Sequence, residues 1–92
     1  MQFEWDERKA AHNLAKHDIA FDQAIAVFID PHPFTFKDLR ADYGGIRVNP
    51  IGAIDGAFFV CVTHTHRSGF IRLFSARPAS LRERKLYHAH NS

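Results

Sequence analysis

The sequence predicts a single α+β domain over residues 1–92, with two helices, then four strands, then a third helix. Three observations predict this class. Helix-capping patterns stand near both ends of the chain, β-rich segments separated by turn residues fill the middle, and 92 residues with 46% hydrophobic content suit one modest core. Because short loops between consecutive strands favour antiparallel pairing, we expect a four-stranded antiparallel sheet.

The two N-terminal helices are predicted from their caps. Asp6 can accept hydrogen bonds at the start of a helix over about Glu7–His17. Asp18 then takes the left-handed position that ends it. Asp22, preceded by Phe21 as a hydrophobic staple, predicts a second helix that ends near Phe28, before the prolines at positions 31 and 33.

Four segments rich in β-branched and aromatic residues follow, with turn residues between them. The predicted strands are Phe34–Lys37, Ile46–Ile51, Ala57–Thr65 and Phe70–Ala76. The predicted connections are the Asp38–Asp42 loop with the Tyr43-Gly44-Gly45 turn, the Asp55-Gly56 turn and the Ser68-Gly69 turn. Pro50 predicts that the second strand is an edge strand or carries a bulge, whereas the apolar run of the third predicts a central strand.

The C-terminal third is basic and ends in a helix. Ser80 and Glu83 form a capping-box pattern that predicts a helix over about Leu81–His90. Residues 64–92 contain six Lys and Arg against one Glu, whereas residues 1–63 contain six against nine Asp and Glu. This asymmetry favours a nucleic acid or an acidic protein as partner, and a simple solvated basic helix is the alternative.

The composition excludes several classes of protein and site. Cys61 is the single cysteine, so an intramolecular disulfide and a cysteine-based zinc site are excluded. The N-terminal residues lack the basic and apolar regions of a signal peptide, and no apolar run approaches the roughly 20 residues that span a bilayer. We therefore expect a cytoplasmic protein with no membrane contact.

The segment Ile71–Arg77 holds the first candidate site. Arg72 and Arg77, with the Ser75 hydroxyl, could hold a phosphate, because an arginine on an inner strand must be paired or face a wet groove. The alternative is that Arg72 pairs with a carboxylate such as Glu4, Asp6 or Asp30. The residue pattern does not separate the two.

Other cations and histidines extend this candidate site. Arg47 and Arg67 flank the same part of the predicted sheet, although Arg47 could equally be an edge-strand charge that discourages aggregation. His17, next to Lys16, suits a general acid or base, and its alternative role is to cap the helix C-terminus. His64 and His66, two residues apart, are a weak candidate for a metal-chelating pair.

Several catalytic motifs are missing from the sequence. It has no glycine-rich phosphate loop, no serine-nucleophile elbow, no zinc-protease helix, and no pair of acidic residues at the spacing of a metal-dependent nuclease. A nuclease built from these residues should therefore be metal-independent. RNA is its natural substrate, because the 2′-hydroxyl of RNA can act as the nucleophile.

Short motifs in a characteristic order run over nearly the whole chain. They are Phe3-Glu4-Trp5-Asp6, Lys9, Asn13, Lys16-His17, Phe21, Ala24, Phe28, Asp30-Pro31, Asp38, Arg40, Tyr43-Gly44, Arg47, Gly52, Ile71-Arg72, Ser75-Ala76-Arg77, Ala79, Arg82-Glu83-Arg84 and Tyr87. In this order they resemble the BrnT-type ribonuclease toxins of type II toxin–antitoxin systems.

The resemblance implies a RelE-like fold, with the four-stranded antiparallel sheet between two N-terminal helices and one C-terminal helix. It implies a ribonuclease that arrests growth, a cognate BrnA-type antitoxin with a ribbon-helix-helix domain, and promoter DNA bound only through the antitoxin. One departure concerns catalysis: Gly45-Ile46 stand where the family commonly has an acidic residue. If that residue is the general base, His17, His64 or Tyr87 must replace it here.

The sequence thus predicts a metal-independent endoribonuclease toxin without a cofactor. The predicted catalytic residues are Arg72, Arg77, Arg47, His17, Ser75 and Tyr87, and the predicted RNA-binding residues are Lys16, Arg67, His64 and Arg82. The alternative is a non-catalytic binding module whose basic groove holds an acidic or amphipathic segment of a partner. Direct DNA binding is a weaker third hypothesis, because no recognition helix stands out.

Overall fold

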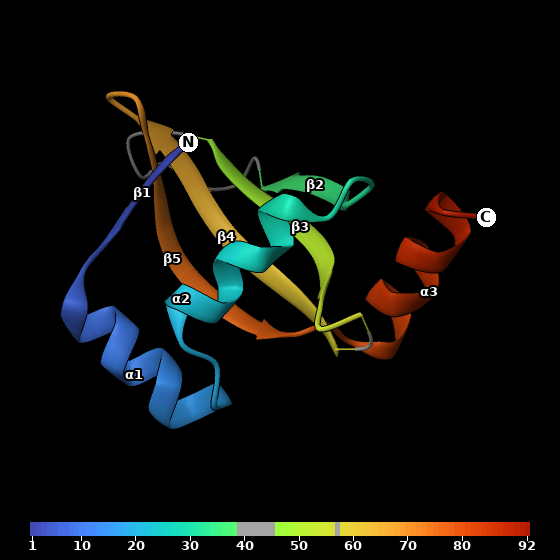
Figure 1. Ribbon diagram of the computed structural model, residues 1–92, viewed down its shortest axis with the longest axis horizontal. Helices are drawn as coiled ribbons and strands as arrows, with labels where there is room; N and C mark the ends of the chain where they lie inside the picture. Colours follow the sequence, from blue (N-terminus) through green and yellow to red (C-terminus); the bar gives the residue numbers. More distant parts are fainter. Residues whose placement is uncertain (39–45, 57) are drawn as a thin grey trace.

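Within the part of the chain that the structure describes, five strands form one sheet, and three α-helices and a 3₁₀ helix accompany it (Figure 1). The computed structural model describes residues 1–38, 46–56 and 58–92. In chain order the elements are β1 Gln2–Trp5, α1 Glu7–His17, α2 Phe21–Ala24, the 3₁₀ helix η1 Ile25–Ile29, β2 Phe34–Asp38, β3 Arg47–Ile54, β4 Phe58–Arg67, β5 Phe70–Pro78 and α3 Leu81–His90. The Tyr43-Gly44-Gly45 turn and all but the first residue of the predicted Asp38–Asp42 loop lie outside the described residues.

The sheet is five-stranded and mixed, so the prediction of four antiparallel strands is wrong in part. The strand order is β1-β5-β4-β3-β2, and β1 pairs in parallel with β5, with Phe3 opposite Ile71. The other neighbours are antiparallel. β1 was missed because four residues are too few to show alternation, and its partner lies near the other end of the chain with no connecting turn to reveal it.

The four predicted strands are present, and β4 is central as expected. Two of the predicted turns have both residues in the left-handed region, with φ values of 57° and 75° for Asp55-Gly56 and 52° and 84° for Ser68-Gly69. Such turns match the twist of the strands that they join.

The expectation for Pro50 is wrong. β3 lies between β2 and β4, so it is not an edge strand. The register against β4 is also the same on both sides of Pro50, with Val48 opposite His64 and Ile51 opposite Cys61, so no bulge separates them. An inner strand tolerates this proline because each residue directs its N–H toward only one neighbouring strand, and one proline therefore removes at most one ladder hydrogen bond.

The first helix begins and ends as predicted. Asp6 Oδ1 accepts hydrogen bonds from the backbone N–H groups of Arg8 and Lys9, at 2.8 and 3.4 Å. These bonds lower the pKa of the Asp6 carboxyl. Asp18 ends the helix in the left-handed conformation, with φ 57° and ψ 33°.

The second helix differs from the prediction in its start and its form. It begins at Phe21 rather than after Asp22, and the side chain of Gln23 accepts a hydrogen bond from the N–H of Ala20. Phe21 is therefore the first residue of the helix and not a residue before it, and its ring is buried in the core. After Ala24 the helix tightens into η1, which crosses β3 so closely that a Cβ atom on Gly52 would lie 2.9 Å from Val27 Cγ1.

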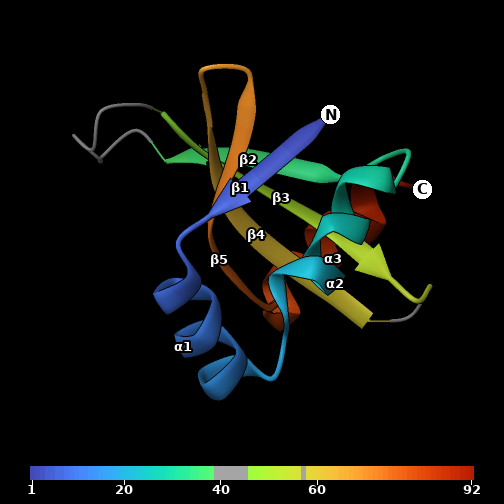
Figure 2. The ribbon, with the colours of Figure 1, turned by 60° about the vertical axis from the view of Figure 1, so that its left-hand side comes forward.

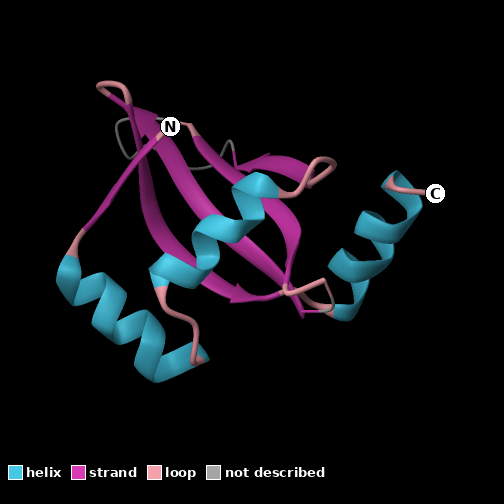
Figure 3. Ribbon diagram, in the orientation of Figure 1, coloured by secondary structure: helices cyan, strands magenta, loops and turns pink. Residues whose placement is uncertain are grey.

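The hydrophobic core lies between α2, η1 and one face of the sheet (Figures 1 and 2). Its buried residues are Ile19, Phe21, Ala24, Val27, Ile54, Val60, Val62, Leu73 and Ala76. The helices at the two ends of the chain, α1 and α3, lie at opposite ends of the sheet (Figure 3).

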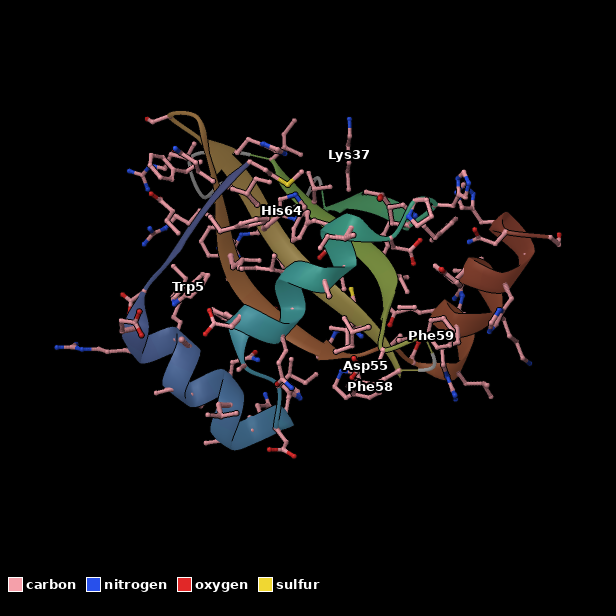
Figure 4. All side chains as sticks on the ribbon, viewed as in Figure 1. Trp5, Lys37, Asp55, Phe58, Phe59 and His64 are labelled. Carbon is pink, nitrogen blue, oxygen red and sulfur yellow. The ribbon has the colours of Figure 1, made fainter. Side chains whose placement is uncertain are left out.

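The last helix has the predicted capping box. Ser80 Oγ accepts from the N–H of Glu83 at 3.1 Å, and Glu83 Oε1 accepts from the N–H of Ser80 at 2.8 Å. No residue of α3 is fully buried. The rings of Tyr87 and His88 lie 5.0 and 5.1 Å from that of Phe59, which stands beside α3 in Figure 4. Among the described residues, no helix is long and apolar enough to cross a membrane.

Candidate functional site

A positively charged groove runs between α1 and the strands β3 and β5. Its volume is about 400 Å³, and its lining consists of Arg8, Lys9, His12, Asn13, Lys16, His17, Arg47, Phe74 and Ser75. Four of these residues are Lys or Arg, two are His, and none is Asp or Glu. We call this cavity the α1 groove. Such a lining favours an anionic ligand, because fixed cations in a concave site raise the local positive potential.

A β-bulge places an aromatic ring on the floor of the α1 groove. Thr63 pairs with Ser75 but His64 pairs with Leu73, so Phe74 is the extra residue on β5. The Phe74 ring lies 4.2 Å from Arg47 Cζ and 4.9 Å from Lys9 Nζ, measured to its centroid. Cations over an aromatic face are attracted to its electrons. One ring therefore holds a cation of β3 and a cation of α1 in the same cavity.

Asn13 fastens α1 to the sheet and so fixes the other wall of the α1 groove. It is the one buried residue of α1. Its side chain donates to the carbonyl of Ala76 at 2.8 Å and to that of Ile19 at 3.0 Å, and accepts from the N–H of Ala76 at 3.0 Å. The pairing of β1 with β5 stops at Trp5 opposite Leu73. Asn13 thus replaces a strand at the edge of β5 beyond this point.

The α1 groove brings together four of the ten predicted site residues, namely Lys16, His17, Arg47 and Ser75. The other six, Arg67, Arg72, Arg77, Arg82, His64 and Tyr87, do not line it. The three arginines that we expected to share one phosphate are therefore divided between this groove and two ion pairs.

Arg72 is paired with the carboxylate of a neighbouring strand. Its Nη1 donates to Glu4 Oε2 at 2.9 Å, and the two residues lie directly opposite each other in the β1–β5 register. Both side chains are partly exposed. The alternative interpretation of Arg72, in which a carboxylate such as Glu4 neutralises its charge, is confirmed.

Arg77 is held by Glu83 of α3. Its two terminal nitrogens donate to the two carboxylate oxygens at 2.7 and 2.8 Å, which is the bidentate geometry that arginine favours. These hydrogen bonds, with those from Ser80, lower the pKa of Glu83 to about 2. They also raise the pKa of Arg77. The carboxylate that completes the capping box of α3 therefore also links that helix to the end of β5.

Tyr87 of α3 is hydrogen-bonded to Asp30, the residue that ends η1. Its hydroxyl donates to Asp30 Oδ2 at 2.5 Å, and this bond raises the pKa of Tyr87 to about 12. Burial opposes the ionised form of Asp30, but the hydrogen bonds from Tyr87, Ala53 and His32 outweigh it and lower the pKa of Asp30. A phenol that holds its proton so firmly is a poor general base near neutral pH.

His64 lies on the core side of the sheet, behind η1 in Figure 4. Only 3% of its surface is exposed, and its ring contacts those of Phe28 and His66 at centroid distances of 4.9 and 5.4 Å. Burial and the neighbouring His66 lower its pKa to about 4. No cluster of three or more metal-binding side chains occurs within residues 1–38, 46–56 and 58–92. Arg67 ends β4, and Arg82 is exposed on α3.

The sequence reasoning missed Arg8, Lys9, His12 and Phe74, all of which line the α1 groove. The first three belong to α1. Their spacing carried a signal, because Arg8, His12 and Lys16 are each four residues apart and form a cationic stripe along one side of a helix. The sequence contains no signal for the position of Phe74, because that position depends on a β-bulge that cannot be predicted from the residue pattern.

Comparison with known proteins identifies the family. Residues 5–83 match the family described as "Ribonuclease toxin, BrnT, of type II toxin-antitoxin system". The fold resembles the crystal structure of the Brucella abortus ribonuclease toxin BrnT with a TM-score of 0.69 and 28% sequence identity, over 87% of this chain and 97% of that one. A search of curated proteins gave no match. The chain therefore belongs to the BrnT family, the ribonuclease toxins of type II toxin–antitoxin systems.

Proposed function

We propose that this toxin cleaves RNA in the α1 groove without a metal ion. The observation that carries the proposal is the groove lining, which joins two imidazoles, four Lys or Arg side chains and a serine hydroxyl in one cavity. RNA cleavage by its own 2′-hydroxyl needs a base, an acid and positive charge around the phosphorane, and this set can supply all three. Magnesium sites need carboxylates, which the described lining does not contain.

The roles follow from chemistry and position. His17 removes the proton of the 2′-hydroxyl, and His12 protonates the leaving 5′-oxygen, because histidine is the side chain that most often serves as general acid or base. Arg47 and Lys9, brought together by the ring of Phe74, stabilise the developing negative charge, with Lys16 as a further cation and Ser75 as a hydrogen-bond donor. Arg72 and Arg77 support the fold through Glu4 and Glu83.

The partner side of the proposal comes from the family. A type II system supplies a protein antitoxin and implies an RNA substrate. We expect the antitoxin to contain a ribbon-helix-helix domain and the complex to bind its promoter through that domain alone.

Cleavage of a short fluorescent RNA in excess EDTA tests the proposal. His17→Ala and Arg47→Ala should lower the cleavage rate by about 100-fold or more, a typical loss for an acid–base or charge-stabilising group. Arg72→Ala, Arg77→Ala and the control Lys85→Ala should stay within about threefold of the wild type once the folded fraction is accounted for. A substrate with a single 2′-deoxy nucleotide at the cut site should resist cleavage.

The opposite pattern would contradict this assignment. If Arg72→Ala and Arg77→Ala abolish cleavage while Arg47→Ala has no effect, the active centre lies at Arg72 and Arg77 of β5 and not in the α1 groove. If EDTA stops the wild-type enzyme and Mg²⁺ restores it, the reaction depends on a metal.

A further inference from the structure

A second hollow lies at the other end of the sheet, between β2 and α3. Its volume is about 420 Å³, and its lining consists of Phe34, Phe36, Ser80, Arg82, Glu83 and Leu86. We call it the β2–α3 groove. Three of its six lining residues are large and apolar, whereas the α1 groove has one such residue among nine. Phe36 and Leu86 are each 37% exposed. An apolar lining of this kind suits protein side chains rather than a phosphate backbone.

The walls of the β2–α3 groove are fixed by bonds on either side of it. The Arg77–Glu83 pair and the Tyr87–Asp30 hydrogen bond hold the body of α3. At its end, the ring of His90 lies 5.7 Å from that of Phe34, and Asn91 donates to the carbonyl of His32 at 3.0 Å. The helix is therefore held against the sheet at several points although none of its residues is buried. A partner would meet a preformed surface, which lowers the entropic cost of binding.

The charge around the β2–α3 groove selects among protein partners. Its one carboxylate in the lining, Glu83, is bound to Arg77 and to the N–H of Ser80. Arg82 lines the groove and is exposed, so the lining carries one cation outside the Arg77–Glu83 pair. The groove therefore combines an apolar surface with one positive charge. Its complement is a segment that places a carboxylate beside apolar side chains.

We infer that the β2–α3 groove is the docking site of the antitoxin. In this arrangement, apolar antitoxin side chains contact Phe36 and Leu86, and an adjacent carboxylate pairs with Arg82. The family supplies a protein partner by definition, and the α1 groove, lined by four Lys or Arg and two His, suits an anion better than an apolar segment. The inference rests on family membership and not on the catalytic roles proposed above.

The test is a growth assay in which toxin variants are expressed with and without the antitoxin encoded beside the toxin gene. The main variant is the double change Phe36→Glu and Leu86→Glu, which removes the apolar contacts and repels acidic residues. The matched control is Leu14→Glu, since Leu14 is a comparably exposed leucine on α1 that lines neither groove. Affinity for the purified antitoxin is measured by titration calorimetry on full-length proteins.

The double variant should arrest growth even when the antitoxin is present, and should bind it at least about tenfold more weakly. The Leu14→Glu control should be rescued like the wild type. Retained toxicity shows that the double variant is folded. If it is not toxic, Arg82→Glu replaces it, because a charge reversal at an exposed position does not disturb packing, and it should also weaken antitoxin binding by about tenfold.

Three outcomes would overturn the inference. The first is wild-type antitoxin affinity in both the double variant and Arg82→Glu. The second is an equal loss in Leu14→Glu. The third is unchanged antitoxin binding with weaker binding of a non-cleavable 2′-deoxy-substituted RNA, which would assign the groove to nucleic acid. Calorimetry with the antitoxin measures binding and does not depend on cleavage. It therefore tests the docking site even if the metal-independent mechanism proves wrong.

Discussion

The two helices at the ends of the chain show two ways of attaching a helix to the same sheet. α1 is attached from within: buried Asn13 exchanges two hydrogen bonds with the backbone of Ala76. α3 is attached from outside, through Arg77–Glu83 and Tyr87–Asp30, and buries no residue fully. Both helices begin with a side-chain cap, and both carry cations. Their difference lies in the environment of the bonds and not in the number of charges.

This difference has an energetic meaning. A buried polar group that loses its partner costs more than a partly exposed one, because water cannot replace the missing bond. α1 should therefore open only with the whole molecule, whereas α3 should open locally at a lower free energy. The proposed catalytic groove uses the firmly held helix, and the proposed docking groove uses the more weakly held one.

The largest expected effect comes from Asn13→Ala. It leaves the N–H and the carbonyl of Ala76 without their partner in a buried place, and we expect a loss of about 4 kcal/mol in the free energy of unfolding. The matched control is Asn91→Ala at the C-cap of α3, whose exposed side chain makes two hydrogen bonds. It should cost under about 1 kcal/mol. Urea denaturation measures both, and equal losses would refute the contrast between the helices.

Acid should weaken the packing around buried His64 at a higher pH than the ion pair that attaches α3. The pKa of His64 is about 4 in the folded protein against 6.5 ordinarily, so the unfolded state binds the proton first. Stability is then complete above about pH 6.5 and falls by about 3 kcal/mol as the pH drops to 4. The ion pair of α3 persists over this range, because the pKa of Glu83 is about 2. In urea titrations at several pH values, His64→Leu should flatten the dependence; an unchanged slope would count against His64 as its source.

The smallest effect is expected from Tyr87→Phe. It removes the hydroxyl that donates to Asp30 and keeps the ring against Phe59, so we expect a loss of about 1–2 kcal/mol. The loss should be local: amide hydrogen exchange should accelerate in α3 and stay unchanged in α1 and β4. Faster exchange throughout the molecule would mean that α3 unfolds only together with the sheet.

The sequence predicted most elements because their signals are local. The Asp6 and Ser80 caps set the starts of α1 and α3, and the turns at Asp55-Gly56 and Ser68-Gly69 separate the strands. β1 could not be predicted from the sequence, because its four residues pair with a strand almost seventy positions away. The close approach of η1 to Gly52 also joins distant parts of the chain, and the sequence has no local signal for it.

The site was predicted less completely, for a related reason. Lys16, His17, Arg47 and Ser75 were identified from residue type and do line one cavity. The pairing of Arg72 depends on register, because Arg72 lies opposite Glu4 only when β1 joins the sheet. The role of Asn13 likewise depends on the edge of β5 that β1 leaves uncovered.

The parallel pairing of β1 with β5 also constrains when the toxin can fold during its synthesis. Phe3 of β1 lies opposite Ile71 of β5, and Asn13 of α1 hydrogen-bonds to the backbone of Ala76. α1 therefore cannot pack against the sheet before β5 has been made. Contacts between residues so distant in sequence form late and slowly. A chain still under synthesis thus has no assembled α1 groove before β5 has been made.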